Sequence, residues 1–92
     1  MRLRWAGPAA HDFVSICDYT EQQYGVAVAG ETARRILESV NSLQQSPNLG
    51  RPGRKRSTRE LVLSGSPILA VYRIRENVIE NVRILHGAQR WP

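Results

Sequence analysis

The feature that most constrains the fold is a pair of strand-forming segments separated by only two residues. Residues 68–75 (ILAVYRIR) and 78–86 (VIENVRILH) are rich in β-branched side chains, and Glu76-Asn77 between them is typical of a tight turn. Residues 59–63 (RELVL) form a third such segment, separated from the pair by the turn-like Ser64–Pro67. Together they predict an antiparallel meander of three strands. A meander cannot cover its own apolar face, so another layer must pack on it.

Two amphipathic helices are predicted to supply that layer. The first begins at Pro8, which suits the first turn of a helix, and stops at Gly25. The second follows almost directly and ends at Ser46-Pro47. Its apolar side chains recur at steps of three and four: Ala29, Ala33, Ile36, Val40 and Leu43. Because the linker is so short, the two helices should form an antiparallel hairpin.

The alternation of Arg2-Leu3-Arg4-Trp5 predicts a short first strand that joins the same sheet. The fold class is therefore α+β, in the order strand–helix–helix–strand–strand–strand. We expect a single domain over residues 1–92, with the helical hairpin packed on one face of a small, mainly antiparallel sheet. The side chains expected to be buried are Trp5, Phe13, Ile16, Ile36, Val40, Leu61, Val71, Ile74 and Ile84.

Composition excludes several classes of protein. A chain of 92 residues with 41% hydrophobic side chains can build one core. No apolar run approaches the roughly 18–20 residues that span a bilayer, and MRLRWAGP is no signal peptide, so we expect a cytoplasmic protein that does not enter a membrane. Cys17 has no partner cysteine, and the two histidines stand far apart. We therefore expect neither a metal site nor a cofactor.

The charge of the chain is concentrated in its second half. The net charge is +5, and 12 of the 13 basic residues are arginines, whose planar groups suit phosphate and carboxylate. Residues 51–92 hold nine basic and only three acidic side chains. The densest cluster is a predicted loop over residues 47–58, with Arg51, Arg54, Lys55 and Arg56. Such a run indicates contact with nucleic acid, or else simply a solvated loop.

Further candidates lie on the predicted strands and the tail. Arg59, Arg73, Arg75 and Arg83 could join the loop in one positive surface on the face of the sheet left uncovered, although each alone could be only a solubilising charge. His86 ends the last strand and is followed by Arg90 and Trp91. A lone histidine there is more often structural. Beside several arginines, however, it would also suit a metal-free ribonuclease, moving protons while guanidinium groups stabilise the phosphorane.

These residues resemble the RelE/ParE superfamily of bacterial type II toxins. The similarity lies in Arg-Glu-Leu-Val (59–62), Val-Tyr-Arg-Ile (71–74) and the closing Arg-Ile-Leu-His-Gly-Ala-Gln-Arg-Trp-Pro (83–92). The first half agrees too, in Trp5 before Ala and Pro, in Asp12 and Ile16 followed by Tyr19, and in the Pro47–Gly50–Arg51 turn. The resemblance covers essentially the whole chain, and it implies the strand–helix–helix–three-strand fold already predicted.

The resemblance also implies a partner. Toxins of this superfamily are paired with a small, acidic antitoxin encoded beside them, whose C-terminal segment wraps along the helical hairpin and the sheet. On this chain, the residues expected to contact the antitoxin are Ile36, Val40 and Leu43. An antitoxin would also cover apolar surface on a domain that is marginally stable because it is small.

The target is less constrained, because the superfamily has two branches. ParE-like members poison DNA gyrase, and RelE-like members cleave mRNA on the ribosome. The sequence is closer to the ParE branch: Gly87 follows His86 where some ribonucleases have Tyr, and lysines are few. A ribonuclease would use His86, Arg59 and Arg83 as catalytic residues. A gyrase poison would instead use surface contacts. The expected target or nucleic-acid contacts are Arg51, Arg54, Lys55, Arg56, Arg73, Arg75, Arg90 and Trp91. A basic nucleic-acid-binding domain without toxicity is a third interpretation.

Overall fold

The computed structural model describes residues 1–87 and 89–91, and it has the predicted order of elements with one short strand added. Ala88 and Pro92, both in the closing segment of the family resemblance, lie outside the described residues. The elements are β1 (Arg2–Trp5), α1 (Gly7–Tyr24), α2 (Val26–Ser42), β2 (Arg51–Pro52), β3 (Arg59–Val62), β4 (Ile68–Arg75) and β5 (Val78–His86).

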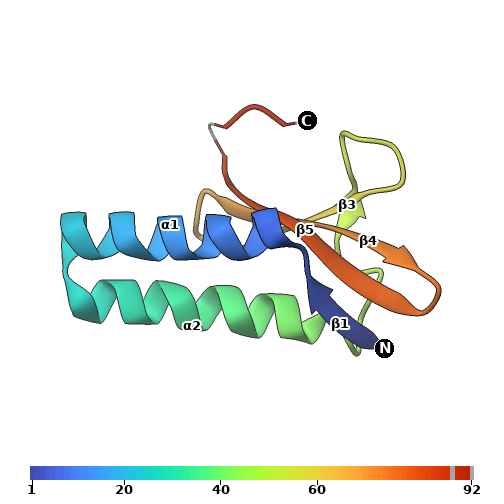
Figure 1. The fold of residues 1–92 in the computed structure, drawn as a ribbon, viewed down its shortest axis with the longest axis horizontal. Coiled ribbons are helices and arrows are strands. Elements are labelled where there is room, and N and C mark those ends of the chain that lie inside the picture. The colour runs from blue at the N-terminus through green and yellow to red at the C-terminus, as the bar shows by residue number, and fades with distance from the viewer. Residues whose placement is uncertain (88, 92) are drawn as a thin grey trace.

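The strands form one mixed sheet in the order β1-β5-β4-β3-β2 (Figure 1). β3, β4 and β5 are the predicted antiparallel meander, whereas β1 lies parallel to β5 with Arg2 opposite Val78. Parallel pairing is possible because a long stretch of chain, with both helices and the other strands, connects β1 to β5. The short β2 lies within the segment predicted as a loop. It pairs with β3 at the edge of the sheet, where a proline such as Pro52 is tolerated.

The helices form the predicted hairpin, and Gly25 alone separates them. Gly25 has a φ of +92°, which side-chain-bearing residues rarely adopt, and its N–H donates to the carbonyl of Glu21 at 2.9 Å. The hairpin packs on one face of the sheet, and its tip extends well past the end of the strands (Figure 1). Within the described residues, neither helix has an apolar stretch long enough to cross a bilayer.

The main core lies between the hairpin and the sheet. Ile36 and Val40 of α2 are fully buried there against buried side chains of the loop after β3, of β4 and of β5: Leu63, Ile68, Ala70 and Ile84. Partly buried side chains close the cluster at its rim: Leu3, Trp5, Phe13, Ile16 and Leu61. The Trp5 and Phe13 rings meet edge to face, with centroids 5.7 Å apart. The predicted packing of helices on sheet is confirmed.

The prediction that Ile74 belongs to the buried core is wrong, because this residue is 37% exposed. Its position in β4 alternates correctly with the buried Tyr72, so the sequence pattern alone assigns it to the core face. The turn between β4 and β5, however, projects beyond the helices on the side away from the hairpin tip (Figure 1). No helix covers that end of the sheet, and alternation cannot reveal where the cover stops.

The opposite face of the sheet has a small apolar cluster of its own. Leu69 and Val71 of β4 and Leu85 of β5 are buried there, and the half-buried Trp91 from the C-terminal tail packs against them. The face expected to be open to solvent is thus partly covered by the tail. Val71 is buried as predicted, but in this second cluster.

Tyr72 ties the segment after α2 to the centre of the sheet. Its fully buried hydroxyl donates to the carbonyl of Pro47 at 2.8 Å and accepts from the N–H of Gly50 at 2.9 Å. A Cβ at Gly50 would lie only 2.7 Å from Cε1 of Tyr72 and 2.9 Å from the carbonyl of Glu60. Glycine is therefore required at this close approach. The segment predicted as a loop over residues 47–58, which we call the basic loop, is thus fixed to the sheet at Gly50.

We predict that Ile84→Ala lowers the free energy of unfolding by about 2–5 kcal/mol, because it leaves a cavity in the main core. Ile74→Ala is the matched control, since it removes the same atoms from an exposed site. It should cost at most about 1 kcal/mol, the span of strand propensities. Chemical denaturation of both variants measures the difference, and equal costs would show that the helix-to-sheet packing is wrong.

Candidate functional site

Arg59 serves as a structural tie. It begins β3 opposite Tyr72 and therefore lies on the helix-covered side of the sheet. Its Nε and Nη2 donate to the carbonyl of Gly50 at 3.0 and 2.6 Å, and Nη2 also reaches the carbonyl of Asn48 at 3.1 Å. Arg73 follows Tyr72 directly and so points to the other face. The predicted row of arginines on one face is therefore broken at β3.

Arg83 is tied to the first helix. It lies at an irregularity in the pairing of β5 with β4, where Val71 is opposite Arg83 but Tyr72 is opposite Asn81. Its Nε and Nη2 donate to the two carboxylate oxygens of Asp12 at 2.6 and 3.0 Å. This pairing raises the pKa of Arg83. The Arg83 guanidinium also lies 5.8 Å from the centre of the Trp91 ring.

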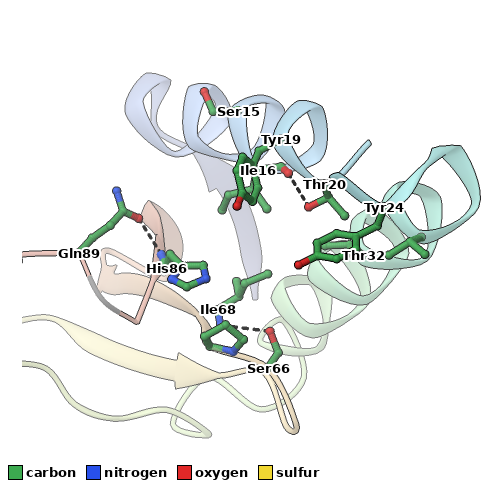
Figure 2. A pocket seen from close by; sticks show the side chains of 12 residues that line it. Ser15, Ile16, Tyr19, Thr20, Tyr24, Thr32, Ser66, Ile68, His86 and Gln89 are labelled. Atoms are coloured by element: carbon green, nitrogen blue, oxygen red, sulfur yellow. Dashed lines mark hydrogen bonds between the residues drawn. The ribbon is translucent and has the colours of Figure 1, made fainter. Parts of the chain in front are cut away.

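His86 ends β5 and is exposed at a groove between the hairpin and the end of the sheet (Figure 2). We call this cavity of about 630 Å³ the hairpin groove. Its helical wall includes Tyr19 and Tyr24 of α1, and its opposite wall is formed by the turn before β4, the start of β4, His86 and Gln89. Apart from His86, every side chain that lines it is uncharged. The groove therefore suits an apolar segment better than a phosphate.

The structure does not bring the predicted ribonuclease residues together. His86 is opposite Ile68, whereas Arg59 is opposite Tyr72, four residues further along β4. At about 3.3 Å per residue, their backbones are offset by roughly 13 Å along the strands. Arg83 is committed to Asp12. General acid–base catalysis needs its groups within hydrogen-bonding reach of one substrate atom, and this arrangement does not provide that.

Two carboxylates organise the basic side chains on the face away from the helices. Glu60 is only 2% exposed and accepts from Arg51 at 3.3 Å, from Arg54 Nε at 3.1 Å and from the Arg54 backbone N–H at 2.9 Å. Burial alone would raise the pKa of Glu60, but these hydrogen bonds outweigh it and hold the pKa below its ordinary value. Glu60 thus folds the basic loop back onto β3.

Glu80 has the same role at the other side of the sheet. It accepts from Arg4 of β1 at 2.6 Å and from Arg73 of β4 at 2.8 Å. The hydrogen bond from Arg4 lowers the pKa of Glu80 most, and the one from Arg73 lowers it further, so Glu80 stays ionised at neutral pH. Each of these two carboxylates therefore pairs with two arginines, so each group of three side chains has a net charge of +1.

Three further cations and Arg73 line a cavity of about 220 Å³, which we call the basic hollow. It lies where the basic loop meets the outer face of β4 and the tail, and its lining includes Lys55, Arg56, Arg73, Arg75 and Trp91. The Lys55 ammonium lies 5.8 Å from the centre of the Trp91 ring. No ion pair forms at Lys55, Arg56 or Arg75 among residues 1–87 and 89–91. Arg90 is exposed and does not line the hollow.

Ile36, Val40 and Leu43, expected as antitoxin contacts, are all 0% exposed. The apolar stripe of α2 faces the sheet, so these side chains form the core and offer no surface to a partner. The exposed apolar side chains of the hairpin lie elsewhere, with Tyr19 59% and Tyr24 67% exposed. Sequence reasoning missed these two tyrosines as a surface. The sequence pattern shows which face of a helix is apolar, but it does not show where the sheet beneath that face ends.

Sequence reasoning also missed the acidic partners Asp12, Glu60 and Glu80. Their pairings join residues up to 76 positions apart, and no local pattern marks such contacts. In the part of the chain that the structure describes, no three His, Cys, Asp or Glu side chains gather in a way that could hold a metal ion.

The comparisons with known proteins agree on one family. The family described as ParE toxin of type II toxin–antitoxin system, parDE, matches residues 3–91. The Sinorhizobium fredii protein Y4kP is 41% identical over 91 residues, which cover 99% of this chain and 93% of that protein. Toxin ParE1 of Caulobacter vibrioides is 32% identical over 79 residues, covering 85% and 80%.

A solved structure agrees with the family match and with the two relatives. The fold matches a chain of the chromosomal ParDE toxin–antitoxin system from P. aeruginosa with a TM-score of 0.88 and 33% sequence identity, covering 94% of this chain and 95% of that one. The order of strands and helices, the mixed sheet and the sequence similarity over nearly the whole length therefore lead to one conclusion: the chain belongs to the ParE toxin family of type II toxin–antitoxin systems.

Proposed function

We propose that this protein is a cytoplasmic toxin that inhibits DNA gyrase by contact and is neutralised by a cognate antitoxin encoded beside it. The observation that carries the proposal is that His86 is exposed at the hairpin groove, whereas Arg59 and Arg83 are each hydrogen-bonded elsewhere in the fold. This argues against an RNA-cleaving centre. Membership of the ParE family supports gyrase as the target.

The state of the two arginines strengthens the argument. A ribonuclease needs guanidinium donors directed at the developing charge of the phosphorane. The Nε and Nη2 donors of Arg59 are occupied by backbone carbonyls, and the Nε and Nη2 donors of Arg83 are occupied by Asp12. Freeing either group would break a part-buried hydrogen bond to a charged group, at a cost of about 1.5–3 kcal/mol.

The hairpin groove is proposed as the seat of the antitoxin. Its lining is mostly apolar, and the exposed rings of Tyr19 and Tyr24 stand at its helical wall (Figure 2). Aromatic side chains of this kind often contribute most to binding at an interface. An apolar stretch of the antitoxin would cover them, in place of the buried Ile36, Val40 and Leu43.

The target surface is proposed to lie on the other face of the sheet. Arg51, Arg54 and Arg73 are paired with carboxylates. The proposed target contacts are therefore the exposed Lys55, Arg56, Arg75 and Arg90, together with the half-buried Trp91 beside Lys55. Arginine and tryptophan are also frequent interface hot spots. Antitoxin and target would then bind at separate surfaces.

We predict that His86→Ala keeps its toxicity. No proton transfer passes through His86 in a gyrase poison, so pulsed expression of the folded variant without antitoxin should still halt growth and induce the SOS response. Its free energy of unfolding should lie within about 0.5 kcal/mol of the wild-type value, since the side chain is exposed. Loss of toxicity together with loss of mRNA cleavage in the folded variant would favour the ribonuclease.

A second prediction concerns the hairpin groove. Tyr19→Ala/Tyr24→Ala should weaken antitoxin binding by at least about 30-fold, as expected for the loss of about 2 kcal/mol at a hot spot. Growth rescue by the antitoxin should fail, while toxicity without antitoxin is retained. Val14→Ala/Val26→Ala is the control, because Val14 of α1 and Val26 of α2 are exposed apolar side chains of the hairpin that lie outside the groove.

Co-purification of the chain with the product of the neighbouring gene, together with growth of the co-expressing strain, measures these effects. If the tyrosine pair binds and is rescued like the control pair, the antitoxin does not sit in the hairpin groove.

A further inference from the structure

The outer face of the sheet has more positive charge than its own carboxylates neutralise. Glu60 and Glu80 are each held by two arginines and stay ionised, as their lowered pKa values show. Neither forms an ion pair with Lys55, Arg56 or Arg75 in the described part of the chain. These three cations therefore gather at the basic hollow with no ion-paired carboxylate, an arrangement that favours an external anion.

The hollow is already organised without a ligand. Glu60 holds the backbone of Arg54, the Gly53 N–H donates to the Thr58 carbonyl at 2.8 Å, and the Thr58 hydroxyl donates to the Lys55 carbonyl at 2.5 Å. These contacts close the loop into a fixed turn. Trp91, seated on the apolar cluster of β4 and β5, lies beside the Lys55 ammonium. The backbone of the loop is therefore already ordered, and the ordering that remains when an anion binds is that of the basic side chains.

The chemistry of the lining distinguishes between two kinds of anionic partner. Lysine and arginine side chains are donors only, and here the hydroxyls of Ser57 and Thr58 are the side-chain oxygens that line the hollow. An acidic peptide would bring backbone N–H donors that need acceptors. A phosphodiester brings only acceptor oxygens. The half-buried Trp91 ring, already beside two cations, supports the site and is a poor platform for stacked bases.

We infer that the basic hollow binds the phosphate backbone of duplex DNA through Lys55, Arg56 and Arg75. The inference rests on the proposed function and deepens it: the toxin would contact the DNA held by gyrase as well as the enzyme. Contacts to phosphates need no particular base sequence, so binding is independent of sequence and sensitive to salt.

The test is titration of a labelled short duplex of arbitrary sequence with the purified full-length toxin, followed by fluorescence anisotropy at about 50–200 mM salt. Three phosphate contacts predict that the logarithm of the binding constant falls against the logarithm of salt concentration with a slope of about −3. Arg56→Gln/Arg75→Gln should reduce that slope by about 2 and weaken binding about tenfold or more at low salt.

Arg34→Gln/Arg35→Gln is the matched control. It removes the same two charges, but from α2 in the other layer, where Arg34 pairs with Glu31 and Glu38 and Arg35 bonds the Ser64 carbonyl. This control should keep the wild-type slope and lose less than about threefold in affinity, the effect of bulk charge alone. Circular dichroism spectra of both variants should match the wild-type spectrum, which checks that both are folded.

Three results would overturn the inference. The first is that the wild-type toxin does not bind the duplex at low salt. The second is that the control variant loses as much affinity as the variant of the hollow. The third is that labelled polyglutamate or single-stranded DNA binds the hollow more tightly than the duplex does. The SOS response separates this inference from the proposed function. Toxin that induces the response without binding DNA refutes only the DNA contact, whereas DNA binding without any effect on gyrase refutes the proposed target.

Discussion

The buried hydroxyl of Tyr72 is the interaction on which the rest of this structure most depends. It holds the carbonyl of Pro47 and the N–H of Gly50, and Arg59 holds the carbonyl of Gly50 beside it. The chain leaving α2 is thereby fixed to the centre of β4. An unsatisfied buried polar group costs about 1–3 kcal/mol, so this small set of hydrogen bonds is stabilising only while all its members are present. The basic loop starts from this fixed point.

Three carboxylates then determine which arginines are structural and which are available. Asp12 joins α1 to β5 through Arg83, Glu60 folds the loop onto β3, and Glu80 joins β1 to β4. Lys55, Arg56 and Arg75 pair with none of these three acids, and they lie together at the basic hollow. A chain with net charge +5 is therefore not uniformly basic, because its few acids neutralise one set of arginines and leave another exposed.

Much of the fold could be predicted from the sequence, because its signals are local. Residues 68–75 and 78–86 match β4 and β5 because β-branched runs flank a two-residue turn, and Gly25 ends α1 as predicted. The two-residue β2 has no such signal, since only its pairing with β3 makes it a strand. Ile74 follows the correct alternation but lies where the helices no longer cover the sheet.

The site could be predicted only as a set of residue types. The sequence identified the basic loop and the arginines of the strands, but not which of them would meet Asp12, Glu60 or Glu80 across long stretches of chain. The fold separates Arg59, Arg83 and His86, which the sequence alone allowed to act together. It also buries the α2 stripe and exposes Tyr19 and Tyr24 in its place.

The proposed function is inhibition of gyrase by binding, without cleavage of RNA. The most direct measurement adds the purified toxin to two reactions in parallel: DNA gyrase with a supercoiled plasmid, and ribosomes translating a defined mRNA. We predict that broken plasmid covalently attached to gyrase accumulates with toxin concentration, while the mRNA stays full length. Cleavage of the mRNA on the ribosome, with no change in the gyrase reaction, would contradict it.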